Sequence, residues 1–153
     1  MYRRVAVILS CLVLVSISDA VESLRKQTIA LTGKNDHVGV YKLLSTSDFA
    51  VVSRDPYLLR RLACAAASTG RNDKATSHFD LLLKLHPKDP INLNAAAWYW
   101  ATAADESYRN GKRAVELSMQ ACRETEFKNP VFLDTAAAAY AEAGDFGLSL
   151  IHI

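Results

Sequence analysis

Residues of the types that most often carry chemistry are sparse in this chain of 153 residues. His78 and His86 are eight residues apart, a spacing too wide for both imidazoles to bind one metal ion from adjacent helical turns. The acidic pair Asp105-Glu106 is typical of a solvated helix end. The sequence contains no serine nucleophile elbow, no glycine-rich phosphate loop and no His-Glu metal helix. We therefore expect a protein that is not an enzyme and that holds no metal and no cofactor.

The cysteines favour a structural role. Cys64 and Cys122 lie in apolar, helix-like surroundings, RLACAAAS and MQACRE, where a small buried thiol is the common explanation. The third, Cys11, lies in an apolar segment near the N-terminus. Two cysteines are also the minimum for one disulfide, and the sequence leaves that pairing open.

The overall charge argues against one class of partner. The chain has 18 Lys and Arg residues against 16 Asp and Glu residues, a formal net charge of +2, and like charges form no run. A protein that binds nucleic acid needs a basic patch to neutralise phosphates. Half of the residues are hydrophobic and 22% are charged, which is ordinary for a folded domain. We expect a globular chain that does not bind nucleic acid.

The N-terminus has the three parts of a secretory signal. The basic start MYRR precedes thirteen uncharged residues, 5–17, and the small residues Ser18 and Ala20 follow. As a helix the apolar run would measure roughly 20 Å, short of the roughly 30 Å hydrocarbon core of a bilayer. We expect residues 1–20 to be a signal peptide, so that the protein is exported to the periplasm or secreted. A buried first helix, an uncleaved membrane anchor and a cytoplasmic location are the alternatives.

The spacing of apolar residues predicts helices along most of the chain. Leucine and alanine recur every three or four positions in residues 56–69, which places them on one helix face. We expect Gly70 to end this helix, and Asn72 and Asp73 to cap the next one. Alternation typical of a strand appears only in short ambiguous pieces such as FAVVS, residues 49–53. The residues expected on the inner faces are Leu58, Leu59, Leu62, Ala65, Ala66, Ala75, Phe79, Leu82 and Leu83.

A similar helix start occurs three times. Asp55-Pro56, Asp89-Pro90 and Asn129-Pro130 each join a capping residue to a proline, and the prolines are 34 and 40 residues apart. Proline suits the first turn of a helix, where its missing N–H group would have no acceptor. Gly70 and Gly144 each lie fourteen residues after such a proline. A period near 34 with this internal pattern indicates stacked helical pairs.

In this frame the residues resemble the tetratricopeptide repeat family. Ala66 departs from the family pattern, which has tyrosine at that position. The resemblance implies an all-α fold in which antiparallel helix-turn-helix repeats stack as an α-solenoid. A longer loop at residues 105–111 is similar to a bacterial subgroup of the family. With Pro56 as the first position, the matching residues are Leu62, Ala63, Gly70, Ala75, Phe79 and Pro87.

The resemblance also divides the chain into segments. Residues 21–55 are interpreted as a degenerate repeat that turns at Gly33, with Val38, Tyr41 and Leu44 on the inner face of its second helix. Two repeats follow at residues 56–89 and 90–129, the second with the longer loop and with Ala114 and Ala121 inside its second helix. Residues 130–147 correspond to the first helix of a truncated repeat. We interpret residues 148–153, LSLIHI, as the translation of a transposase sequencing adapter, with a genuine apolar C-terminus as the alternative.

In this family the first helices of the repeats line a concave groove that holds a peptide or protein segment. Such a groove binds through side chains of the types that dominate interfaces, although Trp98 is equally suited to packing between helices. We therefore expect a non-catalytic interaction or scaffold module with a protein or peptide partner. Contact with a membrane is expected only through an uncleaved signal segment. The alternative is a regulatory repeat arm of a larger multidomain enzyme. The groove residues implied are Tyr57, Arg60, Cys64, Asn94, Trp98 and Asp134.

Overall fold

The computed structural model describes the backbone of residues 2–147 and the side chains of residues 17–147. The predicted adapter segment, 148–153, lies outside the described residues, as do the side chains of most of the predicted signal peptide. Over residues 2–147 the chain forms helices and no strand, so the prediction of an all-α protein is confirmed. The α-helices are α1 Tyr2–Thr32, α2 His37–Thr46, α3 Phe49–Arg54, α4 Pro56–Ser68, α5 Asn72–Leu85, α6 Pro90–Thr102, α7 Gly111–Glu124 and α8 Pro130–Glu142, with a 3-10 helix, η1, at Glu106–Tyr108.

Helices α4, α6 and α8 each begin at a proline, as predicted. The side chain of the preceding residue caps each of them: Asp55 accepts a hydrogen bond from the backbone N–H of Leu58 at 3.0 Å, and Asp89 and Asn129 act in the same way. A side-chain acceptor at this position satisfies a backbone N–H that has no partner within the helix. The three helix starts are therefore fixed by local sequence.

Gly70 ends α4, as predicted. Its φ of +73° lies in the left-handed region, and the N–H of Arg71 closes the turn on the carbonyl of Ala66 at 2.9 Å. The predicted caps of α5 are wrong, because this tight turn brings the chain into the helix one residue early. Arg71 stands at the capping position without a side-chain hydrogen bond, and Asn72 and Asp73 lie in the first turn.

The main core cluster lies between α4, α5 and α6. Phe79 of α5 is almost fully buried and stacks on Tyr99, with 5.1 Å between ring centroids, and it also meets Trp100. The guanidinium of Arg113 lies 3.7 Å above the ring of Trp100, which joins α7 to the same cluster. All the inner-face residues predicted for α4 are buried, as are those for α5 apart from the half-buried Leu83.

Helix α7 returns along α6 after the longer loop. Ala114 and Ala121, predicted inside this helix, are both fully buried. The backbone N–H of Asn110 donates to the carbonyl of Trp100 at 2.8 Å and holds the end of the loop against α6. Gly111 opens α7 so close to the end of α8 that a Cβ atom there would lie 2.5 Å from the backbone nitrogen of Ala143. Only glycine fits this contact without a shift of one helix.

The N-terminal region differs in part from the prediction. The chain does turn near Gly33, between α1 and α2, but Val38 is 65% exposed and Val40 takes its place on the buried face. Val40 and Leu44 are four residues apart and share a face, whereas Val38 lies on the other side of the helix. The ambiguous piece 49–53 is helical, because Asp48 caps it by accepting from the N–H of Ala50.

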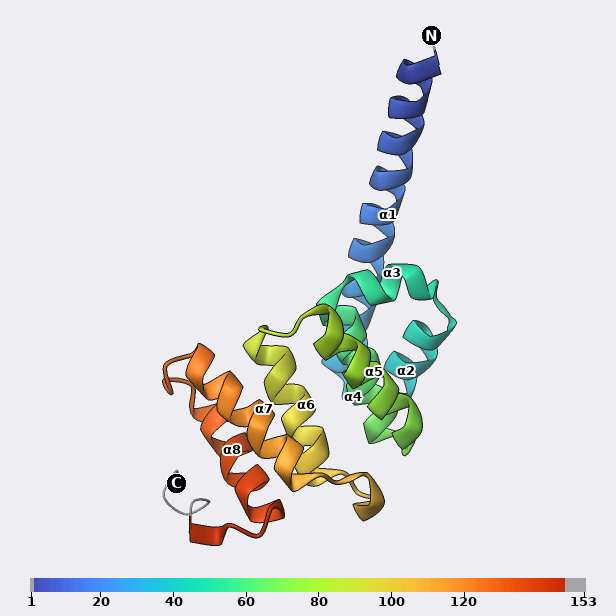
Figure 1. Ribbon diagram of the computed structural model, residues 1–153. Helices are drawn as coiled ribbons and strands as arrows, with labels where there is room; N and C mark the ends of the chain where they lie inside the picture. The colour runs from blue at the N-terminus through green and yellow to red at the C-terminus, as the bar shows by residue number, and fades with distance from the viewer. Residues whose placement is uncertain (1, 148–153) are drawn as a thin grey trace.

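The body has two parts that meet at α6. Figure 1 shows α2 to α5 on one side, α6 to α8 on the other, and the first half of α1 extending away from both. Contacts of α4 and α5 with α6 join the two parts. The last third of α1 packs on α2, α3 and α4, where the Arg25 Nε donates to the Asp55 carboxylate at 2.7 Å. Among the helices that the structure describes, none is long and apolar enough to cross a membrane.

Candidate groove around Trp98

Two hollows lie on either side of Trp98. The first, of about 270 Å³, is bounded by α4, α5 and α6, and we call it the α4–α6 hollow. The second, of about 400 Å³, is bounded by α4, α6 and α8, and we call it the α6–α8 hollow. Cys64, Ala95 and Trp98 line both, so the two form one groove divided by the indole. The residues of the α6–α8 hollow are Cys64, Asn94, Ala95, Trp98, Val131, Asp134 and Thr135.

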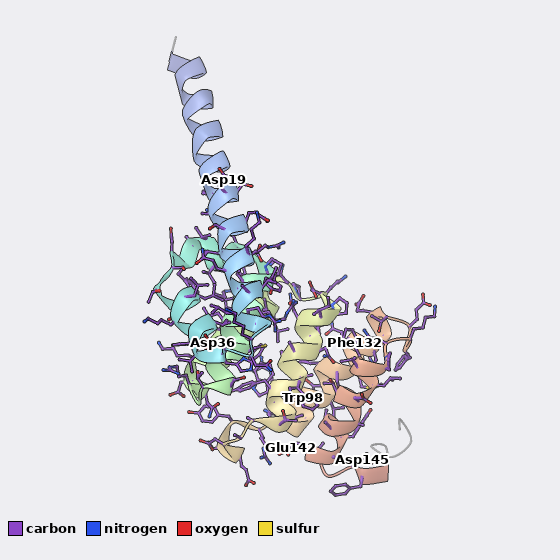
Figure 2. The ribbon with its side chains drawn as sticks, turned by 180° about the vertical axis from the view of Figure 1, so that it is seen from behind. Asp19, Asp36, Trp98, Phe132, Glu142 and Asp145 are labelled. Atoms are coloured by element: carbon purple, nitrogen blue, oxygen red, sulfur yellow. The ribbon has the colours of Figure 1, made fainter. Side chains whose placement is uncertain are left out.

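The structure brings four of the six predicted groove residues together. Cys64 from α4, Asn94 and Trp98 from α6 and Asp134 from α8 all line the α6–α8 hollow. They come from segments up to seventy residues apart in sequence. Figure 2 labels Trp98 on α6.

Tyr57 and Arg60 line neither hollow. The Tyr57 ring is surrounded by three guanidinium groups, those of Arg25, Arg60 and Arg61, whose central carbons lie 5.8, 5.7 and 5.6 Å from its centroid. Arg60 also donates to the Asn92 side-chain oxygen at 2.8 Å and so ties α4 to α6. Both predicted residues therefore act here as contacts between helices beside the groove.

Burial shifts the pKa of the Cys64 thiol and of the neighbouring Arg60 guanidinium. Desolvation raises the pKa of the Cys64 thiol, against the opposing effect of Arg61 and Arg60. Desolvation also lowers the pKa of the Arg60 guanidinium, although Cys64 and Asp89 oppose the shift. Cys64 and Cys122 are free thiols in the structure. At neutral pH Cys64 thus contributes a small apolar wall, which agrees with its predicted structural role.

The α6–α8 hollow contains hydrogen-bond acceptors that no protein donor pairs with. The Asn94 Oδ1 atom is buried and has no hydrogen-bond partner. The Thr135 hydroxyl donates its proton to the Val131 carbonyl at 3.1 Å, which leaves only its lone pairs for the hollow. The Asp134 carboxylate is exposed, and no side chain of residues 17–147 forms an ion pair with it. A buried acceptor without a partner is costly, and a bound donor would remove that cost.

Large apolar side chains are exposed along the same face. Trp98 is 50% exposed, and Ile91 and Val131 are exposed by 53% and 59%. Ile91 and Val131 are both the second residue of their helices, α6 and α8. Their exposure leaves all three side chains available for contact with a partner.

Sequence reasoning missed Ala95 and Thr135, which also line the α6–α8 hollow. Each is the sixth residue counted from the opening proline, in α6 and in α8. Arg61 has the same position in α4. Two short side chains at one position of successive helices leave space beside a tryptophan, and this signal could have located the hollow.

The described residues contain no candidate metal site. Within residues 17–147, no three His, Cys, Asp or Glu side chains are close enough together to hold a metal ion.

The comparisons with known proteins identify no relative. No protein-family model matches the chain, and no curated protein is detectably similar to it. The groove must therefore be interpreted from its own geometry.

Proposed function

We propose that the chain is a tetratricopeptide-type helical-repeat protein that binds a segment of a protein or peptide in the groove around Trp98, without catalysing a reaction. The three proline-opened helices α4, α6 and α8 line the α6–α8 hollow, and α5 joins α4 and α6 around the α4–α6 hollow.

Equivalent positions behave alike in successive helices, which supports the repeat assignment. Leu62, Ala96 and Ala136 are each the seventh residue from their opening proline, and all three are fully buried. Gly70 and Gly144, fourteen residues after their prolines, both have positive φ angles, +73° and +82°. Shared burial and shared turn geometry at a fixed offset are expected of stacked repeats.

The binding proposal rests on one observation: Trp98 is half-exposed between two hollows. A globular chain gains by burying an indole, and its neighbour Trp100 is only 3% exposed. Tryptophan is also the side chain most often found at the centre of an interface. The apolar Ile91 and Val131 continue the surface along the groove, which suits an extended segment rather than a compact small molecule.

The experiment measures capture of a defined peptide pool by the full chain. The probe is a library of N-acetylated, C-amidated nonapeptides with randomised positions, passed over the immobilised protein. Trp98→Ala is expected to reduce retention by at least about 30-fold, since a central interface anchor contributes about 2 kcal/mol or more. Leu85→Ala is the matched control, because Leu85 is 47% exposed and lines neither hollow. Equal retention by the wild-type and Trp98→Ala proteins, with unchanged helicity, would refute the proposal.

We also propose that the protein is exported by cleavage after Ala20. The packing of α1 supports this site: of the described side chains of α1, Val21 is the first that packs on the core of the body. Leu24 and Leu31 follow it, and Thr28 between them is fully buried. Removal of residues 1–20 would thus leave the core contacts of Val21, Leu24 and Leu31 in place.

A further inference from the structure

We propose that the bound segment carries a lysine or arginine side chain, which occupies the α6–α8 hollow with its cationic group at Asp134 and its aliphatic stem along Trp98. This inference rests on the proposed function and specifies the chemistry of its ligand.

The unpaired polar atoms of the hollow accept hydrogen bonds, so a ligand that binds there should supply donors. Asn94 offers a buried side-chain oxygen with no partner, and Thr135 offers a hydroxyl whose proton is already used. Asp134 adds two carboxylate oxygens from the next helix. A lysine ammonium has three donors and a guanidinium has five, so one basic side chain can serve several of these acceptors at once.

The charge of the hollow selects a cation. Asp134 is the one charged residue among those that line it. Arg60 and Arg61 of α4 act on the Cys64 wall through their charge, but both are held against Tyr57 and neither lines the hollow. An acidic ligand would place its carboxylate beside that of Asp134, and this contact is repulsive.

The apolar walls suit the stem of such a side chain. Trp98 and Val131 are exposed on opposite sides of the hollow, on α6 and α8. Lysine and arginine bury their methylene groups on apolar surface while the charged end stays near water. The face of the indole also attracts a cation directly. The volume of about 400 Å³ lies within the usual range of ligand pockets.

The test uses the same nonapeptide library and sequences the peptides that the full-length protein retains. The wild-type pool is expected to be enriched in lysine or arginine next to an apolar residue. Asp134→Asn should reduce that enrichment about two- to five-fold, the range for a partly exposed ion pair, and added salt should do the same. Asp134→Lys should instead favour acidic peptides. Glu116→Gln is the matched control, because Glu116 is exposed on α7 and lines neither hollow.

The outcomes separate this inference from the proposed function. Retention that depends on Trp98 but shows no enrichment in basic residues, or enrichment that survives both substitutions of Asp134, would overturn the inference and leave peptide binding intact. Enrichment in acidic peptides by the wild-type protein would overturn it too and would point to the arginines around Tyr57. Retention that does not depend on Trp98 would overturn both. Since Asp134 is exposed, its substitution should leave the fold unchanged, and circular dichroism checks this.

Discussion

The contact between α1 and the start of α4 allows a quantitative test of how the body is held together. Asp55 is 6% exposed, caps α4 through the Leu58 N–H, and accepts a charge-assisted hydrogen bond from Arg25. Asp89 caps α6 in the same way, but no described basic side chain pairs with it. Asp55 thus has a link to α1 that Asp89 lacks, whereas Asp89 accepts from two backbone N–H groups, those of Ile91 and Asn92.

The expected cost follows from these contacts. Loss of the cap costs about 1 kcal/mol in either Asp55→Ala or Asp89→Ala. The ion pair adds about 1 kcal/mol at Asp55, a value reduced for solvent screening because the Arg25 side chain is 43% exposed. Asp55→Ala should thus lower the free energy of unfolding by about 2 kcal/mol, and Asp89→Ala by about 1 kcal/mol.

The assay is urea unfolding of the full chain, followed by far-ultraviolet circular dichroism. Asp55→Asn isolates the ion pair, because asparagine keeps the cap, as Asn129 does at the start of α8. A double-mutant cycle with Arg25→Ala should give a coupling energy of about 1 kcal/mol. If Asp55→Ala costs no more than Asp89→Ala, or if the coupling energy is zero, α1 does not stabilise the body through Asp55.

Three further measurements test other parts of the structure. Acrylamide should quench the fluorescence of Trp98 far more than that of the buried Trp100, so Trp98→Phe should remove most of the quenching. If the variant is quenched as strongly as the wild-type protein, the Trp98 indole is not exposed. Phe79→Ala should lower the free energy of unfolding by about 3–5 kcal/mol, because it removes a buried ring that stacks on Tyr99 and contacts Trp100, and a loss below about 1 kcal/mol in urea unfolding would contradict the packing described. Because burial raises the pKa of the Cys64 thiol, less thiolate is present at a given pH, and iodoacetamide should alkylate Cys64 more slowly than free cysteine below the usual thiol pKa; an equal rate in mass spectrometry would contradict this.

The predicted export is tested separately with residues 1–25 fused to a reporter in a bacterial host. The N-terminal sequence of the processed fusion should begin at Val21. A fusion that stays intact, or that is cut elsewhere, would show that Ala20 is not the cleavage site.

The sequence predicted the features that depend on neighbouring residues. An aspartate or asparagine before a proline defined the start of α4, α6 and α8, and Gly70 defined the end of α4, because caps and turns depend on a few adjacent groups. The first turn of α5 was predicted wrongly for the same reason. The turn at Gly70 is closed by backbone hydrogen bonds, and α5 begins directly after it without a side-chain cap.

The groove was predicted only in part, since side-chain directions depend on distant partners. The helices α4, α6 and α8 lie around the same hollow and turn the same kind of face toward it. That arrangement brings together Cys64, Asn94, Trp98 and Asp134. Arg60 turns toward Asn92 and Tyr57, and Arg25 in α1 also lies over the Tyr57 ring. No local pattern indicates these contacts, because thirty-two residues separate Arg60 from Asn92, and also Arg25 from Tyr57, in the sequence.

The missing side chain at Gly111 has a consequence for the groove. Because a Cβ atom there would meet the backbone at Ala143, this position limits how closely α7 and the end of α8 approach. Helix α8 also carries Val131 and Asp134, one whole wall of the α6–α8 hollow. An added methyl group at residue 111 would act as a spacer and tilt that wall. The width of the opening is thus adjustable from a site that no ligand touches.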